Sequence, residues 1–377
     1  MANLRELRSR LASIKSTRKI TSAMKMVAAS RLRQAQEALS ESGYFTASLG
    51  RIILRLEKTV EYLRLREPPE TKESAYVIPH ILIGTGDEKK HLVIAFSSSR
   101  GLCGGFNANV AKKTVQFIKY LEENGASVKI ICVGAKIRDA LKNRHGDKII
   151  GFYHGSTDQA GQRADAEKIS MQAVDLHDSG TIDACSLIFN KFSSAISQEV
   201  VIAPLIPVEP IHLLKPFAGD PWGFQDDSEA FHIERQKREI HNVSKSAGTG
   251  IGNSSPKRPS MPAFSAGKDK YVAGRVSSFL ESDAGDSKAK DPLEYDFEPE
   301  NPAALLEALI PELLSTLVYR ATLDSVASEN GARMTAMDNA TNNAADIIDS
   351  LTLLCNRKRQ AMITSELSEI ISGAEAL

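Results

Sequence analysis

The residues best placed to do chemistry are the glycines of SSSRGLCGGFNANV, residues 97–110, which follow an apolar run and precede a helical pattern. Backbone N–H groups at the start of a helix can hold a phosphate group, and glycine lets a ligand approach the backbone closely. The spacing of Gly101, Gly104 and Gly105 matches neither GxGxxG nor GxxxxGK[ST]. We therefore favour a structural turn over a phosphate site.

Other catalytic and metal-binding patterns are missing from the sequence. The 8 histidines are scattered without an HExxH pair, and the 4 cysteines form no CxxC pair. No GxSxG segment marks a nucleophile. The adjacent carboxylates Asp226 and Asp227 lie in a segment too poor in aliphatic residues to enclose a site. The sequence predicts no catalytic residue, no metal site and no bound cofactor.

Charge is balanced over the chain but not along it. The 377 residues carry 47 Lys and Arg and 47 Asp and Glu, so no overall field points to nucleic acid. Residues 1–40 nevertheless contain nine basic residues against only Glu6 and Glu37. This local excess predicts an acidic partner for the start of the chain.

A second polar cluster lies near the end of the chain, in CNRKRQAMITSEL, residues 355–367. Its long hydrogen-bond donors interrupt an apolar repeat. They form either a solvated helix face or a contact in which Arg359 and Gln360 reach a second protein, where a charge-assisted hydrogen bond contributes about 1.5–3 kcal/mol. Periodicity does not choose between these alternatives.

The N-terminal segment predicts one long helix, because residues 3–63 contain no proline and only two glycines. Its length would be about 90 Å. Leu4, Leu7, Leu11 and Ile14 are spaced as in a coiled-coil seam, whereas Arg18 and Thr21 come next in phase. We expect the seam to resume in another phase through the residues Met24, Ala28, Leu32, Ala35 and Leu39.

The C-terminal segment, within residues 302–377, predicts a second helix of about 70 residues and so about 105 Å long. Pro302 falls near its start, where proline is tolerated. We expect the phase of its apolar stripe to be lost at Lys358, and two partial seams suggest that the terminal helices wind round each other. The expected stripe consists of Met337, Ala340, Ala344, Ile347, Leu351 and Leu354.

The middle of the chain has the period of strands alternating with helices, which predicts an α/β, Rossmann-like domain with a largely parallel sheet. The sequence contains no run of about eighteen apolar residues, so we expect no membrane span. The expected strands are 91–96, 127–134, 147–153, 183–192 and 199–208, and the expected helices lie near 107–124, 135–144 and 160–179.

Four regions follow from these patterns. Within 218–290, the stretch 244–269 has thirteen Gly, Ser or Pro among twenty-six residues, which predicts a flexible insertion with at most two short helices. The regions are an N-terminal helix at 1–65, an α/β domain at 75–215, the insertion at 218–290 and a C-terminal helix at 300–377.

Three motifs, in order, resemble one known family. LRSRLASIKSTRKITSAMKMVAASRLRQAQ near the start, SSSRGLCGGFNANV in the middle, and SENGARMTAM with NRKRQAMITSELSEIISGAEAL near the end are similar to the gamma subunit of F-type ATP synthase. The resemblance covers about residues 1–215 and 292–377, since most bacterial members pass from the sheet to the last helix without the insertion.

The resemblance implies both a fold and a role. The two terminal helices would form an antiparallel left-handed coiled coil that turns as an axle inside a ring of three alpha and three beta subunits. The α/β domain would bind the epsilon subunit and the proteolipid ring of the membrane sector. Proton flow would drive rotation, change the catalytic beta subunits in turn and so couple to ATP synthesis, with control over ATPase activity and proton flow. We expect a peripheral complex on the cytoplasmic side of a bacterial inner membrane.

The resemblance also implies contact residues towards the alpha/beta ring. Met24 and its neighbour Lys25 match the N-terminal contact beside the acidic hinge region of the beta subunits, while Arg333, Arg359 and Gln360 match polar contacts of the last helix. The chain departs from the family pattern in two places: Asp338 stands where many members have lysine, and Asn342 where many have aspartate.

Two other functions are weighed against the rotor. A coiled-coil protein that binds nucleic acid would explain the basic first forty residues, but the region lacks stacking aromatics. A nucleotide-binding enzyme would use the turn at Gly101–Gly105. The insertion contains no cysteine, so we expect no thiol control of the kind found in chloroplast-type gamma subunits.

Overall fold

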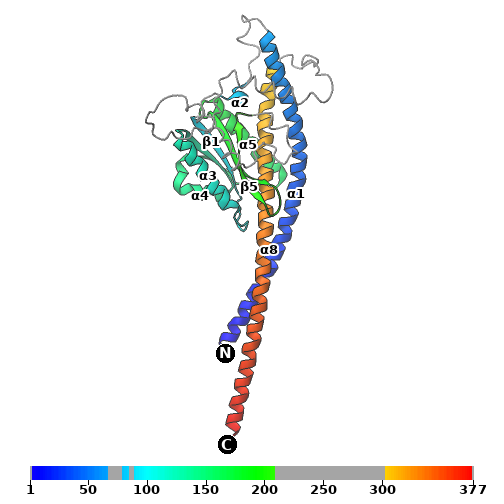
Figure 1. Ribbon diagram of the computed structural model, residues 1–377, viewed down its shortest axis with the longest axis vertical. Coiled ribbons are helices and arrows are strands. Elements are labelled where there is room, and N and C mark those ends of the chain that lie inside the picture. Colours follow the sequence, from blue (N-terminus) through cyan, green and yellow to red (C-terminus); the bar gives the residue numbers. More distant parts are fainter. Residues whose placement is uncertain (1, 67–78, 85–88, 209–301, 376–377) are drawn as a thin grey trace, which may run out of the picture.

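The computed structural model describes residues 2–66, 79–84, 89–208 and 302–375. The expected insertion at 218–290 lies outside the described residues, and so do the short helices considered within it. The described chain forms an α/β domain at one end of a pair of long helices that project well beyond it (Figure 1).

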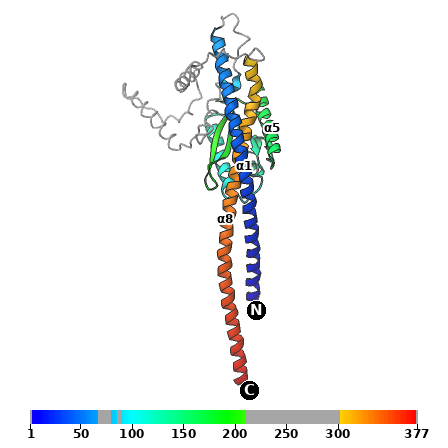
Figure 2. The same cartoon turned by 90° about the vertical axis from the view of Figure 1, so that its right-hand side faces the viewer.

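Each terminal segment is a single helix, as expected. Helix α1 spans Ala2–Arg66 and helix α8 spans Pro302–Glu375, with Pro311 inside its early turns. They run antiparallel and side by side, and α8 extends past the N-terminus of α1 in both views (Figures 1 and 2). The terminal pair therefore forms a rod with one free end.

The α/β domain follows the expected alternation of strands and helices. A one-turn helix, α2 (His80–Ile83), precedes it. Its elements are β1 (Lys90–Phe96), α3 (Phe106–Glu123), β2 (Ser127–Val133), α4 (Ala135–His145), the 3₁₀ turn η1 (Gly146–Lys148), β3 (Ile149–Tyr153), α5 (Gln159–Asp178), β4 (Ala184–Phe192) and β5 (Gln198–Ile206).

The five strands form one sheet in the order β3-β2-β1-β4-β5. Pairs β1–β2, β2–β3 and β1–β4 are parallel, and only β4–β5 is antiparallel. The prediction of a largely parallel sheet is confirmed. The chain runs outward from β1 in both directions, so the order reverses between β1 and β4.

Helices cover both faces of the sheet, which explains why β1 is apolar on both sides. Leu92, Ile94 and Phe96 of β1 pack with α5, α8 and the second half of α1. Val93 and Ala95 point the other way, into a cluster with α3 and α4. Helix α8 is thus a core helix of the α/β domain before it becomes half of the rod.

The seam of α1 corrects our expectation of a phase change. Leu32 lies four heptads after Leu4, so the buried residues Ala28, Leu32 and Ala35 continue the first phase. The residue that misled the prediction is Thr21, which is polar yet only 8% exposed. It stays in the seam because Thr341 of α8 donates a hydrogen bond of 2.8 Å to its hydroxyl oxygen.

The seam of α8 is also shifted from the expected stripe. Met337, Ala344 and Leu351 are placed correctly, but Ile347 is 45% and Leu354 40% exposed. Thr341, Ile348 and Cys355 take those places in the stripe, and Lys358 continues it partly buried, so the phase is not lost there. The prediction counted only strongly apolar residues, so it missed Thr341 and Cys355, which are partly buried in the seam.

Among the described residues, one helix, α8, contains a window long and apolar enough to cross a membrane by length and composition. Of that window, 56% is buried inside the fold. Burial of this kind is what a core helix shows, and it agrees with the packing of α8 against the sheet.

Candidate functional site

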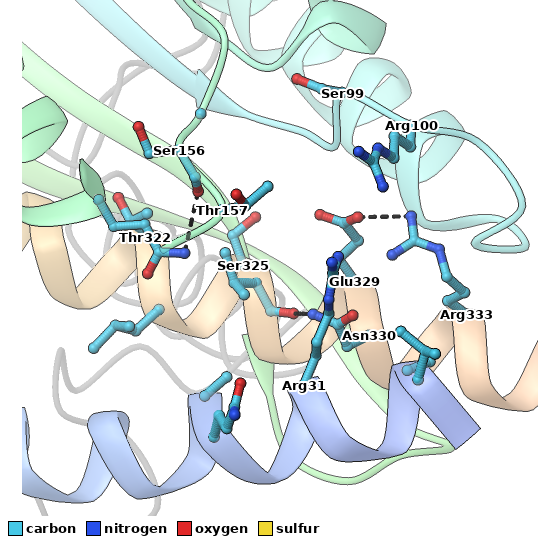
Figure 3. Close-up of a pocket in the computed structure, with 18 of the residues that line it drawn as sticks. Arg31, Ser99, Arg100, Ser156, Thr157, Thr322, Ser325, Glu329, Asn330 and Arg333 are labelled. Atoms are coloured by element: carbon cyan, nitrogen blue, oxygen red, sulfur yellow. Dashed lines mark hydrogen bonds and ion pairs between the residues drawn. The ribbon is translucent and has the colours of Figure 1, made fainter. Parts of the chain in front are cut away.

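A cavity of about 940 Å³ opens where the rod leaves the α/β domain (Figure 3). Its walls include three parts of the chain that are far apart in sequence. Helix α1 contributes Met24 and Arg31, the loop after β1 contributes residues 99–102, and α8 contributes Glu329 and Arg333. The structure therefore joins two of the expected contact residues, Met24 and Arg333, with the glycine-containing loop.

The loop after β1 is a fixed turn. The Asn107 side chain accepts a hydrogen bond from the Ser98 backbone N–H at 3.0 Å and donates one to the Cys103 sulfur at 3.1 Å. Gly104 has a φ of 56°, a left-handed conformation that suits glycine, and the non-glycine residue Leu102 has a φ of 65°. These contacts match the structural turn favoured from the sequence.

The same turn presents an apolar side chain to the outside. Leu102 is 62% exposed although most leucines of the domain are buried. On the adjoining part of α1, Ile20 is 58% and Val27 55% exposed, and both line the cavity. An exposed apolar group of this kind, rimmed by polar residues, marks an interaction surface.

Arg333 holds the loop and α8 together. Its guanidinium pairs with Glu329 at 2.7 Å and donates a hydrogen bond of 3.3 Å to the Gly101 carbonyl. Only 11% of its side chain is exposed. Arg333, expected to contact a partner, is thus mostly engaged by groups of its own chain.

Lys25 has a partner within the rod. Its ammonium pairs with Asp338 of α8 at 2.6 Å, with 42% and 44% of the two side chains exposed. The pair gives a physical account of the unusual aspartate at 338, since an acidic residue there neutralises Lys25 across the helix pair. Because both groups remain wet, the pair contributes at most about 1 kcal/mol to stability.

Arg359 and Gln360 do not line the cavity and lie in the distal third of α8. Both side chains are exposed, on the part of the rod that α1 barely covers. The expected contact residues therefore fall into two groups, one at the cavity and one near the free end.

The structure also places at the cavity residues that the sequence did not single out. Arg31, Arg100, Glu329 and Asn330 lie together near Arg333 (Figure 3). Arg31 was visible only as part of the basic excess, and Arg100 only as one letter of the glycine motif. Glu329 and Asn330 were visible only as letters of the motif SENGARMTAM.

Outside the cavity, the titratable groups with shifted pKa values among the described residues include a buried histidine and two buried cysteines. Burial lowers the pKa of His91 to about 4 and raises that of the Cys132 thiol to about 12, with a smaller opposing effect of the Arg138 charge. Burial also raises the pKa of Cys185 far above its ordinary value. In these ranges no group of three His, Cys, Asp or Glu side chains is arranged to hold a metal ion.

Comparison with known proteins agrees with the resemblance seen in the sequence. A family model described as ATP synthase matches residues 3–377. The gamma chain of ATP synthase from Rhodospirillum rubrum is 36% identical over 377 residues, and that from Pelagibacter ubique is 33% identical, with both chains covered completely in each case.

A solved structure shares the fold. A chain of the Euglena gracilis mitochondrial ATP synthase, in a structure of OSCP, F1 and c-ring in rotational state 3, matches with a TM-score of 0.53 and 18% identity. The match covers 100% of this chain and 94% of that chain. Together with the identity to curated relatives over their full length, these matches confirm the resemblance: the chain belongs to the ATP synthase gamma chain family.

Proposed function

We propose that this subunit of ATP synthase is the central-stalk rotor, which couples proton flow through the membrane ring to ATP synthesis by turning inside the alpha/beta ring. The observation that carries the proposal is the rod itself. Helix α8 has 74 residues, about 110 Å at the usual rise, and among the described residues its projecting part runs beside α1 alone (Figure 1). A compact enzyme domain needs no such projection, whereas a shaft does.

A shaft can drive its neighbours only if its faces differ. A ligand shifts a conformational equilibrium by its unequal affinity for the two states, so a uniform rod would couple nothing. Here Ile20, Met26 and Val27 expose apolar surface on α1, while Arg31 and Arg100 add positive charge beside it. We propose that the beta subunits meet these unequal faces in turn, with Met24 and Lys25 at the contact.

Exposed apolar residues at the free end of α8 favour a second contact with the alpha/beta ring. Ile363, Leu367, Ile370 and Ile371 are 49% to 68% exposed on a stretch beyond the end of α1. Water-exposed isoleucine and leucine in such density call for a protein surface around them. We propose that the alpha/beta ring encloses this tip, with Arg359 and Gln360 making polar contacts just before it.

The opposite end would face the membrane sector. We propose that the α/β domain, bounded near residues 75–215, binds the epsilon subunit and the proteolipid ring, and that the complex sits peripherally on the cytoplasmic side of the inner membrane. In this role the chain needs no cofactor and hydrolyses no ATP alone. The insertion at 218–290 would be an addition to this plan, without thiol control because it lacks cysteine.

Co-expression with alpha and beta subunits tests the proposal. The purified chain should show no ATPase activity, whereas the assembled complex should hydrolyse ATP and rotate a bead attached to the α/β domain. A chain that folds but does not assemble with the ring would refute the rotor role.

A tip variant separates coupling from folding. Changing Ile363, Leu367, Ile370 and Ile371 to serine should leave the unfolding of the isolated chain unchanged but lower the ATPase activity of the complex. A matched control changes the exposed neighbours Thr364, Ser365, Glu366 and Ser368 to alanine and should retain activity. Equal activity of both variants would contradict a bearing at the tip.

A further inference from the structure

The cavity beside the rod gathers positive charge from three elements of the chain. Arg31 from α1, Arg100 from the loop after β1 and Arg333 from α8 direct their guanidinium groups towards the same part of the cavity, around Glu329 (Figure 3). Arginine presents a planar fork of donors that matches the oxygens of phosphate. Three arginines from three elements thus meet at one place.

The acidic residues of the cavity wall do not cancel this charge. Glu329 pairs with Arg333 at 2.7 Å, and Glu37 pairs at 3.1 Å with Arg33, which does not line the cavity. Asp158 caps α5 by accepting a hydrogen bond from the Gly161 N–H at 3.0 Å, and it keeps its negative charge. Within the described part of the chain, the guanidinium groups of Arg31 and Arg100 have no ion-pair partner, so their two positive charges outnumber this one carboxylate.

An independent observation points to a ligand at the same place. Asn330 lines the cavity and is 4% exposed, and its Oδ1 atom is buried with no hydrogen-bond partner in the described residues. Its Nδ2 atom donates to the Val326 carbonyl at 2.8 Å, which accounts for the orientation of the amide. A buried acceptor without a donor is rare in folded proteins, and a small movement of the Asn330 side chain towards the cavity would let a ligand hydroxyl satisfy it.

The cavity also lies at the expected edge of the sheet. Its wall includes Phe96 at the end of β1, Val133 at the end of β2 and His154 just after β3. In open α/β sheets, ligands bind outside the carboxyl ends of the strands, near the point where the strand order reverses. A volume of about 940 Å³ is at the upper end of the range for small-molecule sites.

We propose that this cavity binds a small phosphate-bearing anion, either inorganic phosphate or the phosphate group of a nucleotide. Arg31 and Arg100 hold its oxygens, and a hydroxyl of the same molecule donates to Asn330 Oδ1. The site goes beyond the proposed rotor function, which works without a ligand here. The glycine amides considered from the sequence are not its main donors.

Calorimetric titration of the full-length chain with inorganic phosphate at low ionic strength tests the site. We expect saturable binding of one phosphate per chain, weakened on the order of tenfold or more by Arg100→Gln or Arg31→Gln, because each loses a charge-assisted hydrogen bond. Arg10→Gln is the matched control on α1, since Arg10 is exposed and does not line the cavity, and it should bind as the unchanged chain does. Binding that is absent, or weakened equally by Arg10→Gln, would overturn the proposal.

Three further titrations identify the anion. Sulfate carries no hydroxyl at neutral pH, so it should bind at least several-fold more weakly than phosphate, and equal affinity would overturn the role of Asn330. Tighter binding of ADP than of phosphate would assign the site to a nucleotide, and the reverse would assign it to free phosphate. Displacement of phosphate by a short glutamate-rich peptide at a lower concentration than ADP or phosphate needs would overturn the site in favour of an acidic protein partner.

Discussion

The two ends of helix α8 differ in what surrounds them. Near the α/β domain, Leu313, Leu314, Leu317 and Val318 are all at most 1% exposed, between the sheet and α1. In the distal part, Leu353 is 61% exposed and no sheet is near. One continuous helix is therefore a core element at one end and an open surface at the other. We therefore expect the first part to carry the stability of the chain, and we propose that the second part contacts other subunits.

The sharpest test of this difference compares two leucines of the same helix. Leu317→Ala should destabilise the chain by about 2–5 kcal/mol, because it opens a cavity in the packed core. Leu353→Ala, on the exposed part, should change the free energy of unfolding by no more than about 0.5 kcal/mol. Urea unfolding of the full chain measures both. Similar losses from the two variants would mean that the distal rod is packed as tightly as the core.

Lowering the pH should destabilise the α/β domain through His91, a buried residue of β1. Its ring is buried beside Ser186, whose hydroxyl lies 2.9 Å from Nε2, and its pKa falls from 6.5 to about 4. The unfolded chain therefore binds a proton first as pH falls below 6.5, and stability should decrease by about 3 kcal/mol by pH 4. The effect is absent above pH 6.5.

The control for this titration is His91→Asn, which does not titrate. Its stability should be lower at neutral pH but should lack the part of the pH dependence between 6.5 and 4 that comes from His91. Thermal or urea unfolding at several pH values follows the difference between the two proteins. Parallel stability curves would show that another group carries the dependence.

A third test concerns Gly134, which follows β2 and lies close to the backbone of Ser97. A Cβ on Gly134 would lie 2.2 Å from the Ser97 carbonyl oxygen, and its φ is 98°. Gly134→Ala should therefore cost more than the about 1–2 kcal/mol expected from a left-handed backbone alone. Gly125, with φ 85° and nothing within 4 Å, is the matched control. A Gly125→Ala loss as large as that of Gly134→Ala, measured by urea unfolding, would contradict the close approach.

The smallest effect should come from the start of the projecting rod. Lys25 and Asp338 pair at 2.6 Å but remain 42% and 44% exposed. A double-mutant cycle with Lys25→Met and Asp338→Asn should give a coupling energy of about 0.2–1 kcal/mol that declines in high salt. A coupling above about 2 kcal/mol would mean that the pair is far less hydrated than its exposure indicates.

The sequence specified local structure well. Residues 3–63 lack proline, and the apolar runs of the middle alternate with helical patterns, so the long helices and the largely parallel sheet could both be predicted. These features depend on the period of neighbouring residues, which is a property of a short stretch of chain. The three motifs also sufficed to identify the family.

Pairing across the chain could not be predicted. The seam was misjudged at Thr21 and at Ile347, because a polar residue in a seam depends on what the other helix brings to it. The same holds for the cavity, where Arg31, Arg100 and Arg333 are separated by up to about three hundred residues and carry no shared motif.

The amino-acid sequence by itself thus determined the helices, the strands and the family. Only the tertiary structure decided that Thr341 satisfies Thr21 and that Asp338 neutralises Lys25 across a separation of 313 residues. It also decided that the Asn330 side-chain oxygen finds no hydrogen-bond donor among the described residues. The physical reason is that backbone periodicity is local, whereas hydrogen bonding and charge compensation depend on which distant groups the fold brings together.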